Sequence, residues 1–172
     1  MKTLKSRILE AAHDSGVEAQ ELLPAACSDL LQRITDKFSA NSNYRWPLWE
    51  HLGPLKCSFR SEETWSLLCE MLQMNHIGPL FLVYESSLEK GIISLTDTGS
   101  LKQLLGECQA FVYYVVDPEL AFMLSENDHD YLIAMGEAIS WVQTYLESPR
   151  FQQRKIEIAD FHCLPADLGN QN

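Results

Sequence analysis

The chain has 172 residues and a formal net charge of −11, with 46% apolar and 22% charged residues. This balance is typical of a folded globular protein and excludes a disordered chain. The acidity disfavours nucleic acids and anionic membranes as partners, and no apolar run approaches the ~20 residues of a membrane helix. We therefore expect a single domain over residues 1–172, with no nucleic-acid and no membrane partner.

The N-terminus and the cysteines indicate the compartment. Residues 1–7 are basic, but no apolar segment follows them, which argues against a signal peptide. The cysteine count is odd and no C-x-x-C spacing occurs, which disfavours a disulfide framework and a zinc ribbon. We therefore predict a cytoplasmic protein whose cysteines are buried small apolar residues, namely Cys27, Cys57, Cys69, Cys108 and Cys163.

Residues 1–40 predict a helical N-terminal part. Residues 4–15 carry an apolar face, and Gly16 is a suitable helix stop. A second helix begins near Pro24, because proline suits a first helical turn. Its apolar stripe runs from Cys27 to Phe38 with i, i+3, i+4, i+7 and i+11 spacing.

The segment 44–54 contains two of the four tryptophans. Pro47 predicts a short helical turn that places Trp46 and Trp49 on one side. Large aromatic side chains in such a cluster either close the edge of a core or, where exposed, anchor a protein partner. Both interpretations stay open at this point.

Alternating and apolar segments then predict a sheet. Residues 55–60 alternate as an edge strand, and a helix follows from Ser61, a suitable N-cap, to about Met74. The runs 79–85 and 92–95 predict two strands joined as an antiparallel hairpin.

Strand 110–116 is apolar on both faces, so we expect it to be covered on both sides and central in the sheet. After a turn at Asp117, residues 119–125 return antiparallel. The remaining chain predicts, in order, a strand or helix start at 131–135, a helix at 137–147, and a tail at 150–172 that docks loosely or adds an edge strand.

Together these elements predict an α+β fold, with a mostly antiparallel sheet of four to six strands packed with N-terminal and C-terminal helices. The expected core residues come from the central strand and the helix stripes: Leu30, Ile34, Trp65, Leu68, Leu82, Phe111, Val112, Tyr113, Val115, Val116 and Val142.

The densest polar cluster is residues 126–130, which we call the acidic turn: Glu126, Asn127, Asp128, His129 and Asp130. One interpretation is a solvated turn in which Asn127 and Asp128 bond their own backbone and His129 packs or caps. A second is a partner-binding loop. A third is a metal site or an acid–base site built from carboxylate and imidazole groups.

Other enzyme signals are weak. Cys108 and His129 form a conceivable nucleophile–base pair, although an apolar environment would raise the pKa of the thiol. The sequence contains no G-x-S-x-G, P-loop, dinucleotide fingerprint, H-E-x-x-H or EF-hand loop. We therefore predict no catalytic residue, no metal and no cofactor.

Several segments occur together as in a known group of proteins. They are R-W-x-x-W-E from Arg45, G-E-C-x-x-F-x-Y-Y from Gly106, E-N-D-H-D in the acidic turn, and Gly136. Over residues 44–136 the chain resembles a family of small uncharacterised bacterial proteins with an E-N-H-H-D-like end. Asp128 replaces the first histidine of that pattern, which weakens a two-histidine metal site. The layout is also similar to immunity proteins of the SUKH type, and this resemblance implies a protein that neutralises a toxin by binding.

We therefore expect a non-enzymatic protein-binding module, an immunity protein with a basic protein toxin as partner. The alternatives are a small metal-dependent or acid–base enzyme using residues 126–130, and a housekeeping interaction protein. The predicted partner-binding residues are acidic or aromatic, together with one histidine: Trp46, Trp49, Asp117, Glu119, Glu126, Asp128, His129 and Asp130.

Overall fold

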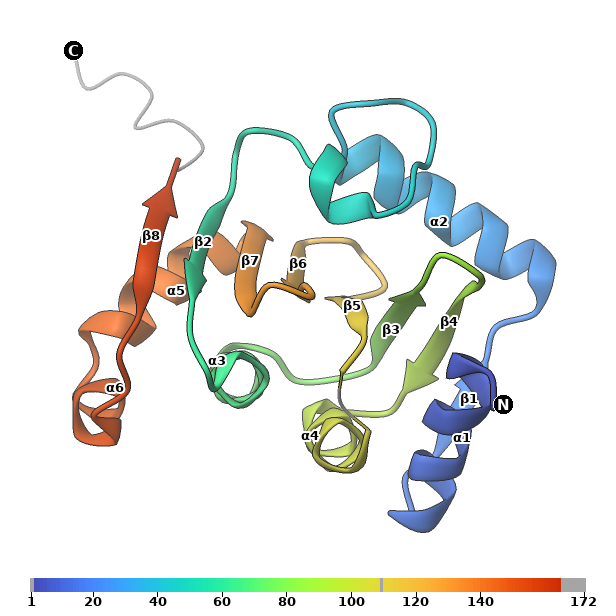
Figure 1. Cartoon of the computed structure of the whole chain (residues 1–172), viewed down its shortest axis with the longest axis horizontal. Helices are drawn as coiled ribbons and strands as arrows, with labels where there is room; N and C mark the ends of the chain where they lie inside the picture. Colours follow the sequence, from blue (N-terminus) through green and yellow to red (C-terminus); the bar gives the residue numbers. More distant parts are fainter. Residues whose placement is uncertain (1, 109, 165–172) are drawn as a thin grey trace.

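The structure is a computed structural model, and it describes residues 2–108 and 110–164 (Figure 1). In chain order its elements are α1 (Leu4–Asp14), β1 (Ala19–Glu21), α2 (Pro24–Phe38), the 3-10 helix η1 (Leu48–His51), β2 (Cys57–Arg60), α3 (Thr64–Asn75), β3 (Leu80–Glu85), β4 (Lys90–Leu95), α4 (Thr98–Glu107), β5 (Val112–Val116), β6 (Phe122–Glu126), β7 (Tyr131–Gly136), α5 (Ala138–Glu147), α6 (Pro149–Arg154) and β8 (Ala159–Cys163).

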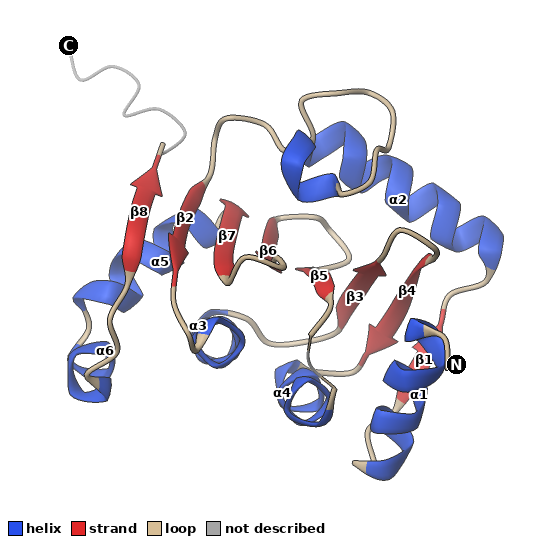
Figure 2. Cartoon of the chain, viewed as in Figure 1, coloured by secondary structure: helices blue, strands red, loops and turns tan. Residues whose placement is uncertain are grey.

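The strands of the described residues form one eight-stranded sheet in the order β1-β4-β3-β5-β6-β7-β2-β8 (Figure 2). Every neighbouring pair is antiparallel. The α+β class and the antiparallel sheet are therefore confirmed, and β5 lies inside the sheet between β3 and β6. The predicted number of four to six strands is wrong, because the sheet also contains the short strands β1 at one edge and β8 at the other.

The two edge strands carry little apolar patterning. β1 has three residues and interrupts the predicted helical part at residues 1–40. β8 is exposed along most of its length and pairs with β2. β2 is therefore not the edge strand that its alternation predicted. Of the two alternatives for the tail, the edge strand is the one that forms, over residues 159–163. Residues 149–154, at the start of the predicted tail, form α6, and residues 165–172 lie outside the described residues.

The sheet is covered on both faces by separate apolar clusters. Successive residues of a strand point to opposite faces, and β5 divides accordingly. Tyr113 and Val115 join the cluster beneath α1, α3, α4 and α5, whereas Tyr114 and Val116 join the cluster beneath α2 and η1. Figure 1 shows α3 and α4 on one side of the sheet and α2 on the other.

The long elements follow their sequence signals closely. Thr3 caps α1 by accepting a hydrogen bond from the N–H of Ser6 at 3.1 Å, and Pro24 begins α2 as predicted. Residues 131–135, which fit a strand or a helix, form β7. This strand ends at Gly136 with φ +62°, where a Cβ would lie 2.3 Å from the carbonyl oxygen of Ala121.

Most of the predicted core is buried, with Val115, Ile34 and Val142 at 0% exposure. Three residues of that prediction, Trp65, Phe111 and Val112, are only half-buried. All three line one hollow at the end of the central strands. The prediction is wrong for them, because the apolar run of β5 begins, and α3 starts, at the border of this hollow and not under the covered part of the sheet.

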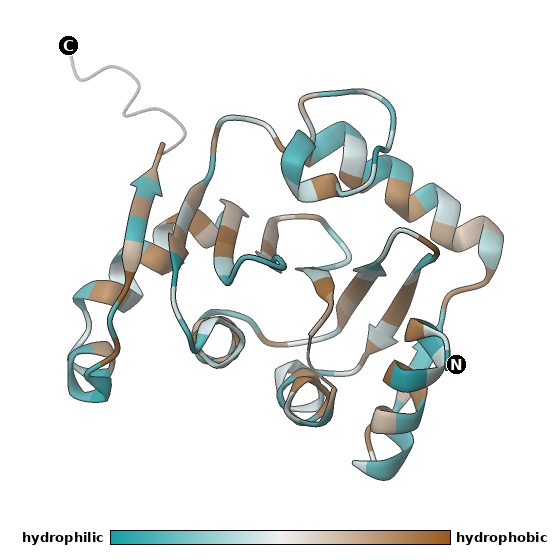
Figure 3. Ribbon diagram, in the orientation of Figure 1, coloured by the Kyte–Doolittle hydropathy of each residue, from teal (hydrophilic) through white to brown (hydrophobic). Residues whose placement is uncertain are grey.

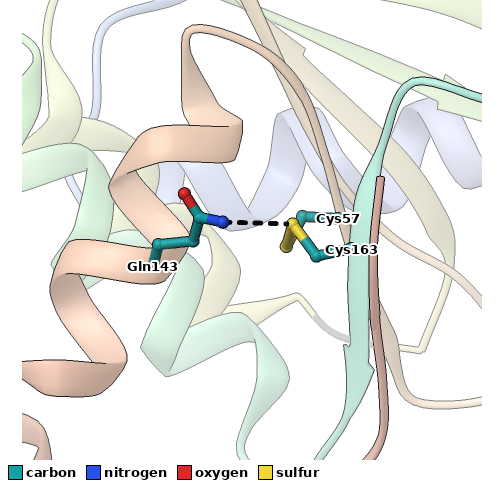
Figure 4. The surroundings of a disulfide bond; sticks show 3 residues. All are labelled: Cys57, Gln143 and Cys163. Carbon is teal, nitrogen blue, oxygen red and sulfur yellow. Dashed lines mark hydrogen bonds between the residues drawn. A yellow bond between two sulfur atoms is a disulfide. The ribbon is translucent and has the colours of Figure 1, made fainter. Parts of the chain in front are cut away.

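Two cysteines are paired, contrary to the prediction of five free thiols. Cys57 of β2 lies opposite Cys163 of β8, and their sulfur atoms form a disulfide with a Cα–Cα distance of 4.0 Å (Figure 4). The Nε2 atom of Gln143 on α5 lies 3.7 Å from the Cys163 sulfur. The bond links residues 106 positions apart, a pairing that cysteine spacing does not reveal. Cys69 and Cys108 are buried and free, as predicted.

Apolar colouring concentrates on the inner strands, including β3, β4 and β7 (Figure 3). Within the described residues, no helix combines the length and the apolar character needed to cross a membrane. The apolar residues instead face the two sides of the sheet.

Candidate functional site

The acidic turn connects β6 to β7 and is built around a buried amide. Asn127 is 5% exposed, and its Oδ1 accepts hydrogen bonds from the N–H groups of His129 at 2.9 Å and Tyr131 at 3.0 Å. Asp130 has φ +60°, and its carbonyl accepts from the Thr64 hydroxyl of α3 at 2.9 Å. The amide of Asn127 therefore holds the turn, as the solvated-turn interpretation expected for this residue.

Three other side chains of the turn are exposed, namely Asp128, His129 and Asp130. The His129 ring packs edge-on against Trp49, with ring centroids 5.5 Å apart and an interplanar angle of 86°. The side chains of this turn thus lie beside the tryptophan segment, although about 80 residues separate them in the sequence.

Glu126, at the end of β6, is half-buried and faces the opposite strand. Tyr113 donates its hydroxyl to Glu126 Oε2 at 2.6 Å, because the two residues are paired across β5 and β6. Burial raises the pKa of the Glu126 carboxyl, the bond from Tyr113 lowers it, and the charge of Asp130 raises it. A carboxylate has acceptor capacity beyond this one bond.

A second buried carboxylate, Glu85, was not predicted as a site residue. It ends β3 at 2% exposure and accepts hydrogen bonds from the hydroxyls of Tyr44 and Tyr114 and from the Leu48 N–H, the last at 2.9 Å. Burial raises the pKa of Glu85, and these three hydrogen bonds oppose the rise. The hydroxyl of Tyr114 also accepts from the backbone N–H of Trp49 at 2.9 Å.

This network attaches the segment 44–52 to the sheet and thereby positions Trp46. The Trp46–Pro47 peptide bond is cis. Trp46 is 51% exposed, whereas Trp49 is half-buried against the cluster beneath α2. Trp49 therefore fits the interpretation of an aromatic side chain that closes the core, whereas Trp46 is exposed at the surface.

These features meet at a hollow of about 700 Å³ at the end of the sheet where β3 and β6 finish and β5 begins. Its lining comes from α1, the segment before η1, the start of α3, and the ends of the three strands: Leu4, Arg7, Trp46, Glu62, Trp65, Glu85, Ser86, Ser87, Ala110, Phe111, Val112, Glu126, Asn127, Asp128 and Asp130. We call it the strand-end pocket. It unites Trp46 with three of the predicted acidic residues.

Two predicted site residues lie elsewhere. Asp117 and Glu119 follow β5 at the opposite end of the β5–β6 hairpin, since Val116 pairs with Met123 and Tyr113 pairs with Glu126. Asp117 is 7% exposed, and its Oδ1 accepts from the Ala121 N–H at 2.7 Å. The fold does not bring these two residues together with the acidic turn.

The residues considered for a metal site or for a nucleophile–base pair are not brought together either. Among the described residues, no group of three or more His, Cys, Asp or Glu side chains is placed to hold a metal ion. Cys108 lines a different hollow with Glu10 and Asp14, where burial raises the pKa of its thiol, whereas His129 packs on Trp49. The structure does not support a Cys108–His129 pair.

Sequence reasoning missed Glu62, Trp65 and Glu85 as members of the site. Glu85 had one detectable signal, because it is a carboxylate directly following an apolar strand. Glu62 and Trp65 had none, since both fit an ordinary helix start.

Comparisons of this chain with protein-family models, with curated proteins and with solved structures found no match.

Proposed function

We propose that this chain is a non-enzymatic protein-binding module, an immunity protein that neutralises a basic protein toxin. One observation carries the proposal: the exposed Trp46 and the carboxylates of the acidic turn line the same strand-end pocket. Tryptophan is enriched among the residues that dominate binding energy at interfaces, and carboxylates around it favour a basic partner.

The charge of the whole chain supports the same partner class. A formal charge of −11 attracts a basic protein at long range and speeds its encounter. The proposed binding residues are Trp46, Trp49, Glu126, Asp128, His129 and Asp130, with Trp49 acting through its contact with His129. Asp117 and Glu119 are left out of this set, because they lie at the other end of β6.

The test uses the C-terminal domain of a toxin-like reading frame encoded next to this gene. Co-expression is expected to restore growth, and the two proteins are expected to elute together from a sizing column at low salt. Failure to rescue growth, combined with the absence of a complex, would overturn the proposal.

Association kinetics locate the interface. The double variant Asp128→Lys, Asp130→Lys is expected to slow association by about tenfold or more at low salt, with a smaller change in dissociation. Glu119→Lys is the control, because it reverses an exposed charge at the other end of β6. It reverses one charge where the double variant reverses two, so the two effects are compared per reversed charge. Equal slowing per reversed charge would show that overall charge, and not the acidic turn, guides the partner.

A further inference from the structure

We infer that the strand-end pocket takes a guanidinium group, presented as an arginine side chain by the basic partner. This inference rests on the proposed function and adds the chemical group that the partner must place in the pocket.

The lining is acidic. The described lining residues include five carboxyl side chains, Glu62, Glu85, Glu126, Asp128 and Asp130, and one basic side chain, Arg7 of α1. Glu85 already accepts three hydrogen bonds within the protein, so the acceptors for a cation come from the other four. Asp128 and Asp130 are exposed at the turn, while Glu126 lies deeper on β6. A cation entering here meets acidic groups both at the exposed turn and deeper in the pocket, and these groups complement its charge.

Aromatic walls make the pocket suited to a flat cation. Trp46 reaches it from the segment over the α2 side of the sheet, and Trp65 reaches it from α3 on the other side. Phe111 contributes a third ring, and all three are exposed or half-exposed. Cations stack over such rings, with tryptophan the strongest partner and arginine the more frequent cation.

The protein itself already uses this kind of contact nearby. The Lys90 ammonium lies 3.6 Å from the centroid of the Tyr44 ring, and Tyr44 donates its hydroxyl to Glu85. A ring and a carboxylate therefore act together on a cation next to the pocket.

The guanidinium is favoured over an ammonium for two reasons. Its planar fork matches carboxylate oxygens and stacks on aromatic faces, which a compact ammonium does less well. It is also more weakly hydrated, so it loses less solvation in a site lined by Trp46, Trp65 and Phe111.

The first experiment titrates agmatine, a small guanidinium compound, into the full chain alone. Tryptophan fluorescence and calorimetry are expected to show saturable binding with a Kd of about 1 mM. Cadaverine, which carries amines only, is expected to bind at least about threefold more weakly. Absence of saturable agmatine binding, or equal binding of the two compounds, would overturn the inference.

Variants test the residues. Trp46→Ala and Glu126→Gln are each expected to weaken agmatine binding about fivefold, which corresponds to about 1 kcal/mol. Glu119→Gln, which removes an exposed carboxylate at the other end of β6, is the control and is expected to leave the Kd unchanged. Agmatine binding that is unaffected by both pocket variants would place the site elsewhere.

The outcomes separate this inference from the proposed function. A toxin complex without agmatine binding would keep the function and remove the guanidinium pocket. Agmatine binding that responds to Trp46→Ala, without any toxin complex, would keep the guanidinium site and remove its assignment to a toxin's arginine side chain.

Discussion

Strand β6 lies between two turns that contain acidic residues: the β5–β6 turn at residues 117–121, and the acidic turn after β6. The two turns use different side chains to hold their backbones. In the turn before β6, the carboxylate of Asp117 is buried and accepts backbone N–H groups from Ala121 and Phe122, at 2.7 and 3.4 Å. In the acidic turn after β6, the neutral amide of Asn127 takes this role. The second turn therefore holds its backbone without a carboxylate, and its acids lie at the surface and around the strand-end pocket.

The difference shows that acidic residues in a segment do not by themselves make a binding surface. A carboxylate is available to a partner only if it does not already accept hydrogen bonds from the turn's own backbone. The residues that pack beside the turn then decide what kind of surface it forms. The first turn meets Arg33, which donates to the Pro118 carbonyl at 3.3 Å. The second meets two tryptophans that a distant segment supplies.

A substitution that prevents β5 from forming should unfold the sheet and, with it, both turns. Val115 is 0% exposed and pairs with Leu82 and Leu124 on the neighbouring strands. Val115→Asp buries an unpaired charge, which costs several kcal/mol, so we expect no soluble folded protein. The readout is the soluble yield and the circular dichroism spectrum. Phe161→Asp, an equivalent change on exposed β8, should fold, and a folded Val115→Asp would contradict the sheet order.

Removing the two turn acceptors should cost similar amounts of stability. Asp117→Ala and Asn127→Ala each leave two backbone N–H groups without a partner, so each should lower the free energy of unfolding by about 1–3 kcal/mol. Urea denaturation measures the change. Glu119→Ala and Asp128→Ala are the controls, and both should stay within about 0.5 kcal/mol, because these side chains are exposed.

The pH dependence of stability should report the buried carboxyls beside the acidic turn. Glu85 and Glu126 have pKa values that are raised in the folded state. The folded state then binds more protons at these two groups, so their contribution to stability is greatest below the unfolded pKa of about 4.5 and falls as pH rises to the folded pKa. Each group contributes a slope of at most about 1.4 kcal/mol per pH unit.

Glu85→Gln and Glu126→Gln should flatten this fall. Glu126→Gln keeps an acceptor oxygen for Tyr113, and Glu85→Gln keeps one for Leu48 and Tyr114, while the Tyr44 hydroxyl would accept from the new amide. Denaturant titrations at several pH values between about 4 and 8 provide the measurement. An unchanged slope in both variants would mean that these carboxyls titrate alike in the folded and unfolded chains.

The smallest effect is expected from exchanging the two turn acceptors. Asp117→Asn and Asn127→Asp keep the oxygen that accepts the backbone N–H groups and change only its charge, so each should cost less than about 1 kcal/mol. Chemical denaturation of both variants checks this. A loss as large as that of the alanine variants would show that the charge state, and not the acceptor oxygen, decides how each turn is held.

Elements with a strong local signal were predictable from the sequence. The apolar stripe of α2 and its first proline predicted a helix that the structure contains, and the β3–β4 hairpin followed from two apolar runs with a short connection. β1 and β8 were missed or left open, because short exposed strands show no periodic pattern and gain their order from pairing with their neighbours. α6 was missed because six residues are too few to show helical periodicity.

The sequence by itself determined the charge, the periodic segments and the acidic turn, because these depend on residues close together in the chain. The tertiary structure alone decided that Cys57 meets Cys163 and that Asp117 lies away from Asp128. It also decided that Trp46, Trp65 and Glu126 surround one pocket. Such proximities arise from strand order and register, which set where distant segments meet and which no local pattern encodes.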